Sequence, residues 1–406
     1  MHPLLKPSAI ALLLIASHTH AAGYQLAEQS ATGLGRAFAG EAAIADNASV
    51  LSRNAAAMSR FDQTAFSGGV IYVRPEVNIN GKVDSQSAAA SDIANDAWIP
   101  NAYLIMPLNE QWRLGFSATS YYGLGVKMPD NYSASHFGNV SNIKTVDVGT
   151  ALAYQVTPLL AVGAGLSVTY GEGEVGGSLT LPPQLGSHTL VSHVEGEGAE
   201  LGWNLGLLLT PSAQTRVGLG YRHGIDLKLK GDAINLGKHE TGHLVLTLPA
   251  TAELALFHQL SDQLALHGSV NWSDWSQFSG LTAILDNAEV MDFKAGYMKD
   301  SWRYSLGMTY QFTPQWQLRS GLAYDQSPIP ADQRSMTIPD SDRIWYSIGV
   351  GHQYSKALSI DLGITLLDGK KVEVTKSKDV VAYVSRLNAN SEGDAWLAGA
   401  QLNYLF

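Results

Sequence analysis

The sequence predicts an all-β fold: a transmembrane antiparallel β-barrel of about 14 strands with an N-terminal plug, or hatch, inside its lumen. Three observations predict it. Charged residues are only 15% of the 406 residues, although the mean hydropathy is −0.02. Apolar and polar residues alternate with a period of two along most of the chain. Short turns alternate with longer polar segments, which is typical of outer-membrane barrels.

Composition excludes several other classes of protein. A soluble domain carries about 25% charged residues, and a bundle of membrane helices has a much higher mean hydropathy. The 40 glycines and the net charge of −10 argue against a collagen-like chain and against a nucleic-acid partner. The chain contains no cysteine, so disulfides, thiolate nucleophiles and cysteine-ligated metals are excluded.

The first 21 residues read as a secretory signal peptide. Lys6 supplies the positive charge, Ala9–Ala16 forms a short apolar run, and Thr19–Ala21 offers a small-residue cleavage site. The apolar run is too short to span a bilayer. We therefore expect cleavage after Ala21 and export from the cytoplasm, with Ala22 as the first mature residue.

Strands with one apolar face explain the period of two. One example is the series Leu358, Ile360, Leu362, Ile364 and Leu366. The residues between them are small or polar, as in the other strands of this type, and few are charged. A soluble sandwich would carry charges on its outer face, whereas a membrane barrel has lipid outside and a closely packed polar lumen.

The spacing of the turns predicts the number of strands. Short polar turns recur at Pro107–Glu110, Thr157–Pro158, Pro211–Gln214, Ser261–Asp262, Thr313–Pro314 and Ser355–Lys356. Longer polar segments, which we expect to be loops, lie between them at 77–96, 123–142, 174–195, 231–240, 280–288, 327–339 and 377–392. Six turns and seven loops connect about 14 strands, an even number with short connections on one side.

Aromatic residues support a barrel over residues 61–406. The last strand ends at Phe406, the usual terminal residue of such barrels, which the barrel-assembly machinery reads. Trp112 and Trp316 follow short turns, where an interfacial aromatic girdle is expected. Ordinary packing is the alternative explanation for these two tryptophans.

Residues 22–60 have a different pattern. They are rich in Ala, Gly and Ser, show no period of two, and precede the first expected strand, Thr64–Val73. So short a segment cannot form a hydrophobic core alone. We expect it to plug the lumen of the barrel; a periplasmic tail is the alternative.

Several motifs resemble the FadL family of outer-membrane long-chain fatty acid transporters. They occur along the whole mature chain, in the segments 22–26, 33–37, 40–46, 272–278, 324–330, 338–345 and 391–396. The resemblance implies a 14-stranded barrel with an N-terminal hatch in the outer membrane of a Gram-negative bacterium. It also implies passive diffusion of a hydrophobic ligand to an inner site near the mature N-terminus. The ligand then leaves sideways where the third strand is kinked.

The resemblance assigns candidate site residues. Ala22, Gly23 and Tyr24 match the part of the hatch that contributes to the inner ligand pocket. Gly123 matches the kink beside the lateral opening, where glycine accepts a positive φ and leaves space. The alternative interpretation is that this glycine only marks a loop.

Other matches depart from the family pattern. Asn54, Ala55 and Ala56 stand where the family has Asn-Pro-Ala near the wall opening, and the proline is missing. Lys294 lies near the basic residue that meets the fatty acid carboxylate, whereas Gly177 replaces a second basic residue. Losing one cation favours uncharged ligands, since a charge-assisted hydrogen bond contributes about 1.5–3 kcal/mol.

Three alternatives to fatty acid transport remain open at this point. Uptake of monoaromatic hydrocarbons is the nearest, and a general porin or surface receptor is the next. An enzyme is the last, because the 12 histidines are scattered without a nucleophile motif, and His188 with His193 is a weak metal signal. We expect no catalytic residue, no metal and no cofactor. The expected partners are the hydrophobic ligand, outer-membrane lipid with lipopolysaccharide, and the barrel-assembly machinery.

Overall fold

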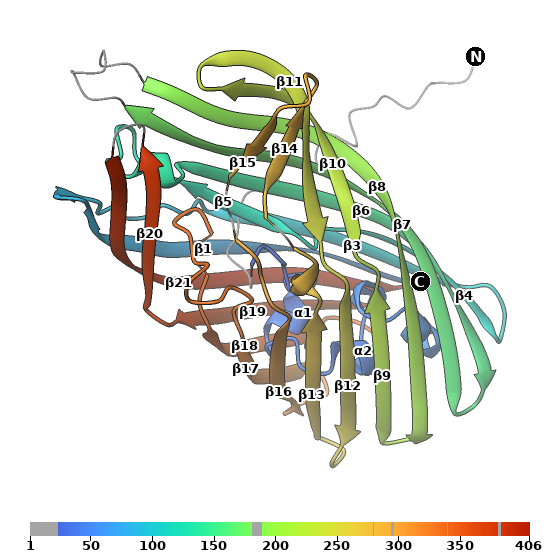
Figure 1. Cartoon of the computed structure of the whole chain (residues 1–406). Coiled ribbons are helices and arrows are strands. Elements are labelled where there is room, and N and C mark those ends of the chain that lie inside the picture. The colour runs from blue at the N-terminus through green and yellow to red at the C-terminus, as the bar shows by residue number, and fades with distance from the viewer. Residues whose placement is uncertain (1–22, 181–188, 279, 294–295, 339, 381–382) are drawn as a thin grey trace, which may run out of the picture.

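The structure is a computed structural model that describes residues 23–180, 189–278, 280–293, 296–338, 340–380 and 383–406. The described strands form one antiparallel sheet that closes on itself (Figure 1). Closure occurs where the first strand, β1 (Ala65–Val83), pairs along its whole length with the last, β21 (Tyr383–Leu405). This closure leaves the sheet without a long free edge.

In the described part of the chain, 14 strands cross the barrel wall, as expected, when consecutive collinear pieces are counted together. In order they are β1, β3 (Ala97–Pro107), β4 (Trp112–Thr119) with β5 (Gly123–Lys127), β6 (Val140–Thr157), β7 (Leu160–Thr180), β8 (Thr189–Ser212), β9 (Thr215–Arg222) with β10 (Ile225–Asn235), β11 (Lys238–Leu248) with β12 (Thr251–Gln259), β13 (Leu264–Ser273), β16 (Ser301–Gln311), β17 (Trp316–Asp325), β18 (Arg343–Gln353), β19 (Leu358–Gly369) and β21. Short elements extend the long-loop end: β2 (Gln86–Ser87), β14 (Thr282–Leu285), β15 (Val290–Asp292), β20 (Val372–Val380), η5 (Ser135–Phe137) and η7 (Trp275–Gln277).

Several segments expected to be loops are paired strands instead. β7 and β8 pair from Leu160 with Leu209 up to Thr180 with Thr189, through most of 174–195. β10 and β11 form a hairpin through 231–240, and β1 runs ten residues past the expected end at Val73. The loop boundaries were wrong because the apolar alternation ends with the lipid, whereas backbone pairing continues wherever a neighbouring strand remains.

The outer wall carries the apolar band that the alternation predicts. Leu166, Leu201 and Leu306 are 66%, 71% and 73% exposed. Trp112 and Trp316 lie at the beginnings of β4 and β17, and each is 40% exposed. Their rings lie 4.7 Å from Tyr154 and 4.2 Å from His352, between ring centroids, at the short-turn end. These aromatic pairs occupy the position of an interfacial girdle.

The N-terminal segment, residues 23–61, lies inside the ring of strands (Figure 1). It contains α1 (Ala31–Leu34), α2 (Glu41–Ile44), η3 (Ala48–Ser52) and η4 (Ala55–Arg60). Side chains cap three of these short helices: Ser30, Asn47 and Asn54 each accept a hydrogen bond from a backbone N–H in the first turn. Among the described residues, no helix is long and apolar enough to cross a membrane.

Glycines of the wall let the backbone of the N-terminal segment lie directly on the strands. A Cβ added to Gly363 would lie 2.7 Å from the carbonyl oxygen of Ala31, and one added to Gly349 would lie 2.8 Å from the Cα of Gly35. Added Cβ atoms at Gly218, Gly220 and Gly321 would also overlap backbone atoms of this segment. Side chains on these inward positions would therefore exclude the segment from the lumen.

Ion pairs hold the N-terminal segment and the wall each in shape, and a hydrogen bond joins the two. Arg36, only 1% exposed, pairs with Glu41 at 2.9 Å and with Asp46 at 2.7 Å, which ties α1 to α2. On the wall, Asp361 pairs with Arg319 at 2.8 Å and accepts a hydrogen bond from Thr32 Oγ1 at 2.6 Å. A buried carboxylate requires such partners, because an unpaired buried charge is strongly destabilising.

Substituting valine for Gly363 tests the glycine contacts. The added side chain meets the backbone of Ala31, so we expect the N-terminal segment to undock and trypsin to cleave after Arg36 and Arg53. Overpacking of this kind costs about 1–3 kcal/mol of stability or more. Trypsin digestion of the folded protein in detergent, with the heat-modifiable gel shift as a folding check, measures both effects.

The matched control is Gly268→Val. A Cβ at Gly268 meets no atom closer than 3.5 Å, so this variant should keep wild-type trypsin resistance. Equal resistance of Gly363→Val and wild type would show that the wall glycines do not seat the segment.

Candidate functional site

The wall of the barrel has a break in its hydrogen-bond ladder between β3 and β4. These strands pair only from Ala102 with Ala118 to Pro107 with Arg113. On its other edge, β3 continues to pair with β1 as far as Ala97. In the described structure the stretch Ala97–Asn101 therefore has no strand partner on the β4 side. Pro100, which cannot donate to a ladder, lies in this half-paired stretch, as is usual for proline at a sheet edge.

The kink between β4 and β5 turns inward at this break. Tyr121 and Tyr122 are buried there, and their hydroxyls donate to the carbonyl oxygens of Ser52 at 3.1 Å and Pro249 at 2.7 Å. The Arg222 guanidinium lies 3.7 Å from the centroid of the Tyr121 ring. These contacts hold the third crossing strand away from β3.

The N-terminal segment takes the place of β3 as the partner of the kink. Leu26 N donates to Tyr121 O at 2.7 Å, and Gly123 N donates to Tyr24 O at 2.8 Å. A Cβ on Gly123 would lie 3.3 Å from Leu26 Cδ1. Because Gly123 does not have a positive φ, that part of the expectation was wrong; the glycine serves by leaving space.

Tyr24 is the centre of a buried aromatic cluster. Its ring centroid lies 4.5 Å from that of Trp275 and 6.1 Å from that of Phe278, both edge-on, and 6.4 Å from that of Tyr122. Gly23 has a φ of +65°, and its backbone lies against the Trp275 ring. Burial raises the pKa of Tyr24, so its hydroxyl stays protonated and donates to the carbonyl oxygen of Thr247.

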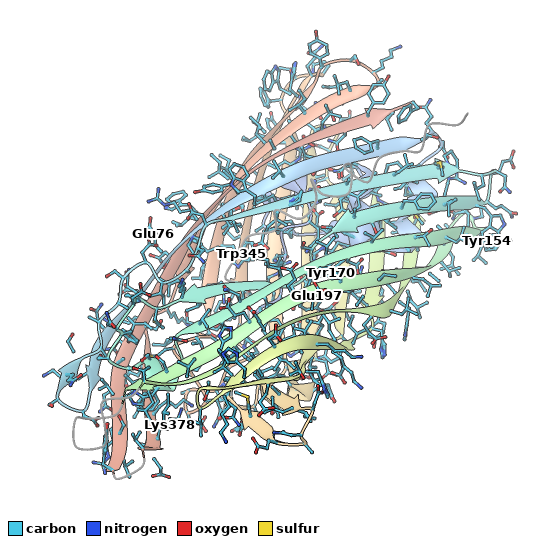
Figure 2. All side chains as sticks on the ribbon, turned by 90° about the horizontal axis from the view of Figure 1, so that it is seen from above. Glu76, Tyr154, Tyr170, Glu197, Trp345 and Lys378 are labelled. Atoms are coloured by element: carbon cyan, nitrogen blue, oxygen red, sulfur yellow. The ribbon has the colours of Figure 1, made fainter. Side chains whose placement is uncertain are left out.

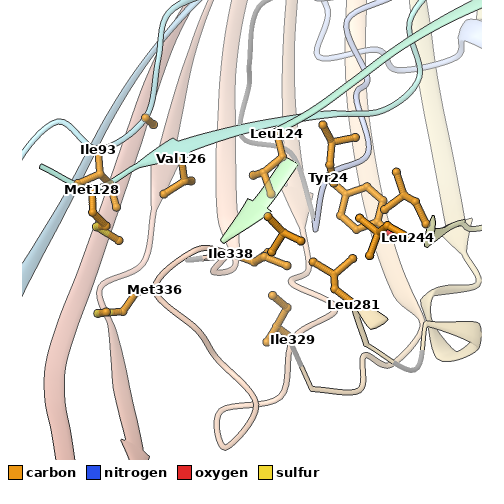
Figure 3. Close-up of a cluster of buried hydrophobic side chains, with 14 of the residues drawn as sticks. Tyr24, Ile93, Leu124, Val126, Met128, Leu244, Leu281, Ile329, Met336 and Ile338 are labelled. Carbon is orange, nitrogen blue, oxygen red and sulfur yellow. The ribbon is translucent and has the colours of Figure 1, made fainter. Parts of the chain in front are cut away.

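A large apolar cluster fills the lumen between Tyr24 and the long-loop end (Figure 3). Its side chains come from the wall and from the long connections, and they include Ile93, Leu124, Val126, Met128, Leu244, Leu281, Ile329, Met336 and Ile338. Such a cluster in the interior of a barrel suits a hydrophobic ligand, since an aqueous pore is lined by polar groups.

Two small cavities lie next to the N-terminal segment, each of about 40 Å³. Gln25, Leu26 and Arg53 line both of them. Ligand sites are usually about 300–1,000 Å³, so side chains must move apart before a ligand enters here. The space beside Leu26 and Arg53 is therefore too small for a ligand in this structure.

The structure brings together some of the expected site residues and separates others. Gly23, Tyr24 and Gly123 meet at the wall break. Asn54 instead donates through Nδ2 to Ala42 O at 2.7 Å and to Leu207 O on β8 at 3.0 Å. Ala55 and Ala56 lie against Gly163 of β7. Ala22 and Lys294 lie outside the described residues, as do the proposed signal peptide and His188.

Sequence reasoning missed the aromatic partners of Tyr24. Trp275 and Phe278 belong to the family-like segment 272–278, and Tyr122 adjoins Gly123, but nothing in the spacing indicated that they meet. In the described parts of the chain, no group of three or more His, Asp or Glu side chains is arranged to hold a metal ion.

The chain is similar to known outer-membrane proteins over nearly its whole length. Residues 12–406 match the family model described as outer membrane protein transport protein (OMPP1/FadL/TodX). The chain is 36% identical to the long-chain fatty acid transport protein of Escherichia coli O6:H1, covering 98% of this chain and 97% of that one. It is 34% identical to outer membrane protein P1 of Haemophilus influenzae, with 98% of each chain covered.

Solved structures share the fold. The crystal structure of a Pseudomonas aeruginosa FadL homologue matches with a TM-score of 0.87 and 23% identity, covering 95% of this chain and all of that one. The Pseudomonas putida toluene transporter TodX matches with a TM-score of 0.70 and 18% identity, over 89% and 94% of the two chains. With the family model and the curated relatives, this fold shows that the chain belongs to the outer membrane protein transport family of OMPP1, FadL and TodX.

Proposed function

We propose that the protein carries long-chain fatty acids through the outer membrane by passive diffusion and releases them sideways at the break between β3 and β4. One observation carries the proposal: the apolar cluster in the lumen extends to Tyr24 and Leu124, beside the kink that leaves Ala97–Asn101 without a β4 partner. A fatty acyl chain gains about 0.8 kcal/mol for each CH₂ that it buries. It therefore favours an apolar route that opens directly into lipid.

The proposed division of labour has three parts. Residues 1–21 export the chain, residues 22–60 plug the lumen, and residues 61–406 form the barrel. The contacts of residues 23–61 with inward-facing wall glycines support the plug. Gly23 and Tyr24 line the inner ligand site, with Ala22 and Lys294 assigned to it by family resemblance, and Gly123 borders the exit. Asn54, Ala55 and Ala56 brace the plug against β7 and β8, two strands that do not border the exit.

Uptake of uncharged aromatic hydrocarbons is the second candidate function. Gly177 stands where the family carries a basic residue, and the chain shares its fold with the toluene transporter TodX. A site with fewer cations discriminates less strongly in favour of carboxylates. Relatives that are named fatty acid transport proteins at up to 36% identity favour the first candidate.

A catalytic function is not proposed, although one Ser–His pair lies close together. His136 Nε2 lies 2.9 Å from Ser385 Oγ, and Ser385 donates to Asp84 Oδ2 at 2.9 Å. Because the serine proton points to the carboxylate, His136 must donate to the serine oxygen and is not available as its base. Ser385 is also fully buried. We infer that this trio joins extracellular segments.

The outer face suggests the surrounding partners. Its apolar band meets lipid, and above it Glu172 and Glu197 lie in register, with Tyr170 donating to Glu197 at 2.6 Å (Figure 2). Lys144 lies opposite Glu172, and Lys230 opposite Glu197, in the register of the neighbouring strands. We propose that this charged rim meets lipopolysaccharide and that the terminal strand engages the barrel-assembly machinery.

Uptake in a transporter-deficient host tests the proposed function. Cells that express the protein should take up radiolabelled oleate well above the rate of empty-vector cells, and toluene uptake should rise less. A larger gain for toluene would favour the second candidate. A correctly assembled protein that increased neither rate would rule out both, and equal uptake of small polar solutes would indicate a porin.

The variant Gly123→Arg tests the exit. A Cβ at this position already lies 3.3 Å from Leu26 Cδ1, so an arginine must displace Leu26 and occupy the space beside the break; we expect oleate uptake to fall more than tenfold. Binding of oleate to the purified barrel should change less than threefold, because the apolar cluster is intact. Gln263→Arg, in an exposed short turn, adds the same charge away from the kink and should behave as wild type. A binding loss as large as the uptake loss would contradict an exit role.

Lys294→Ala tests the assignment of a carboxylate partner. A charge-assisted hydrogen bond contributes about 1.5–3 kcal/mol, so oleate binding should weaken roughly tenfold to a hundredfold. Toluene binding should be nearly unchanged, because toluene has no charge for the ammonium to meet. Isothermal titration with both ligands measures the difference, and equal losses would refute the role.

A further inference from the structure

Asn101 lies on the inward face of β3, as the last residue of the stretch Ala97–Asn101 that has no β4 partner. Its neighbours on that face are Ile99 and Tyr103, two residues away on either side. Tyr103 marks the face as inward, since its hydroxyl donates to Gln29 O of the N-terminal segment at 2.9 Å. The proposed exit therefore has a polar amide at its edge.

The amide of Asn101 has no partner within the described structure. The residue is 3% exposed, and neither Oδ1 nor Nδ2 makes a hydrogen bond to any described group. Its partner on β1 is Gly69, which has no side chain, and on the other edge β4 has already separated. Buried amides are nearly always hydrogen-bonded, because a missing bond leaves the cost of desolvation uncompensated.

The surroundings favour a neutral partner. Ala97 and Ile99 on β3 are buried and apolar, as is Leu26 at the kink. The Arg53 guanidinium is already paired with the carboxylate of Glu253 at 3.7 Å. It also donates to Ala27 O at 2.8 Å and to Gln29 Oε1 at 2.6 Å. An ionised carboxylate entering an apolar region without a cation loses its hydration, so a carboxyl group takes up a proton there instead.

An asparagine amide matches an undissociated carboxyl group. Its Nδ2 donates to the carboxyl C=O while its Oδ1 accepts from the carboxyl O–H, which satisfies both groups with two hydrogen bonds. A carboxylate offers acceptors only and would leave Oδ1 without a donor. A hydrocarbon would leave both amide atoms unsatisfied.

We infer that Asn101 is a specificity-determining residue that holds the protonated carboxyl group of a fatty acid as the chain leaves through the wall. The inference rests on the proposed function and adds that the fatty acid passes the exit in its protonated, uncharged form. The proton comes from water before the head group reaches the break, stays on the ligand during passage, and returns to water when the head group reaches the membrane surface.

The test compares Asn101→Leu with wild type in cells that take up oleic acid or 8-heptadecene, the same chain without its carboxyl group. Leucine is nearly isosteric with asparagine and removes both hydrogen bonds. Uptake of oleic acid should fall about tenfold, whereas uptake of 8-heptadecene should stay within twofold of wild type or rise. The control is Ile99→Leu, an apolar exchange on the same face, which should keep the wild-type ratio of the two rates.

The outcomes are distinct. An unchanged ratio in an assembled Asn101→Leu protein would overturn the inference and would mean that only water satisfies the amide. Wild-type protein that carries neither compound would instead refute the proposed function. Assembly is checked by heat-modifiable migration, where loss of an unpartnered amide should not lower the unfolding midpoint. If the leucine variant fails to assemble, Asn101→Ala is compared in the same way.

Discussion

The seating of the N-terminal backbone on wall glycines is the constraint on which the rest of this structure depends. The carbonyl oxygen of Ala31 lies 2.7 Å from where a Cβ of Gly363 would be, and the Cα of Gly35 lies 2.8 Å from where a Cβ of Gly349 would be. This close approach lets a chain without a core of its own fill a 14-stranded ring. The ion pairs of Arg36 then orient the helices that the glycines admit.

The ladder break is stable because the same segment compensates for it. Separating β4 from β3 removes backbone hydrogen bonds, which would leave polar groups unsatisfied inside a membrane wall. Two bonds to Tyr24 and Leu26 replace part of that loss, and the hydroxyls of Tyr121 and Tyr122 anchor the inward turn. Because Gly123 has no side chain, the N-terminal segment and the kink between β4 and β5 lie close enough to form those bonds.

Much of the fold was predictable, whereas the site was predictable only in part. The period of two and the turn spacing predicted the barrel, because lipid and lumen impose opposite requirements on alternate residues. Strand length beyond the lipid was missed, since polar hairpins such as β7–β8 have no apolar signal. Resemblance pointed to Tyr24 and Gly123 as candidates, and the structure places them in contact at the ladder break. Resemblance could not place Trp275 against Tyr24 or show that Asn101 lacks a partner, because both depend on packing between residues that are distant in sequence.

The pairing of Gln25 with Tyr122, together with α1 against β18, β19 and β21, has a consequence for how the molecule is made. The residues of α1 must find partners that are synthesised near the end of the chain. They must do so before the seam between β1 and β21 is sealed, because a closed cylinder leaves little room to thread a folded segment. Contacts of such large sequence separation form slowly. We therefore expect the sheet to fold around the N-terminal segment. Closure of the barrel and packing of the segment inside it would then be one cooperative step.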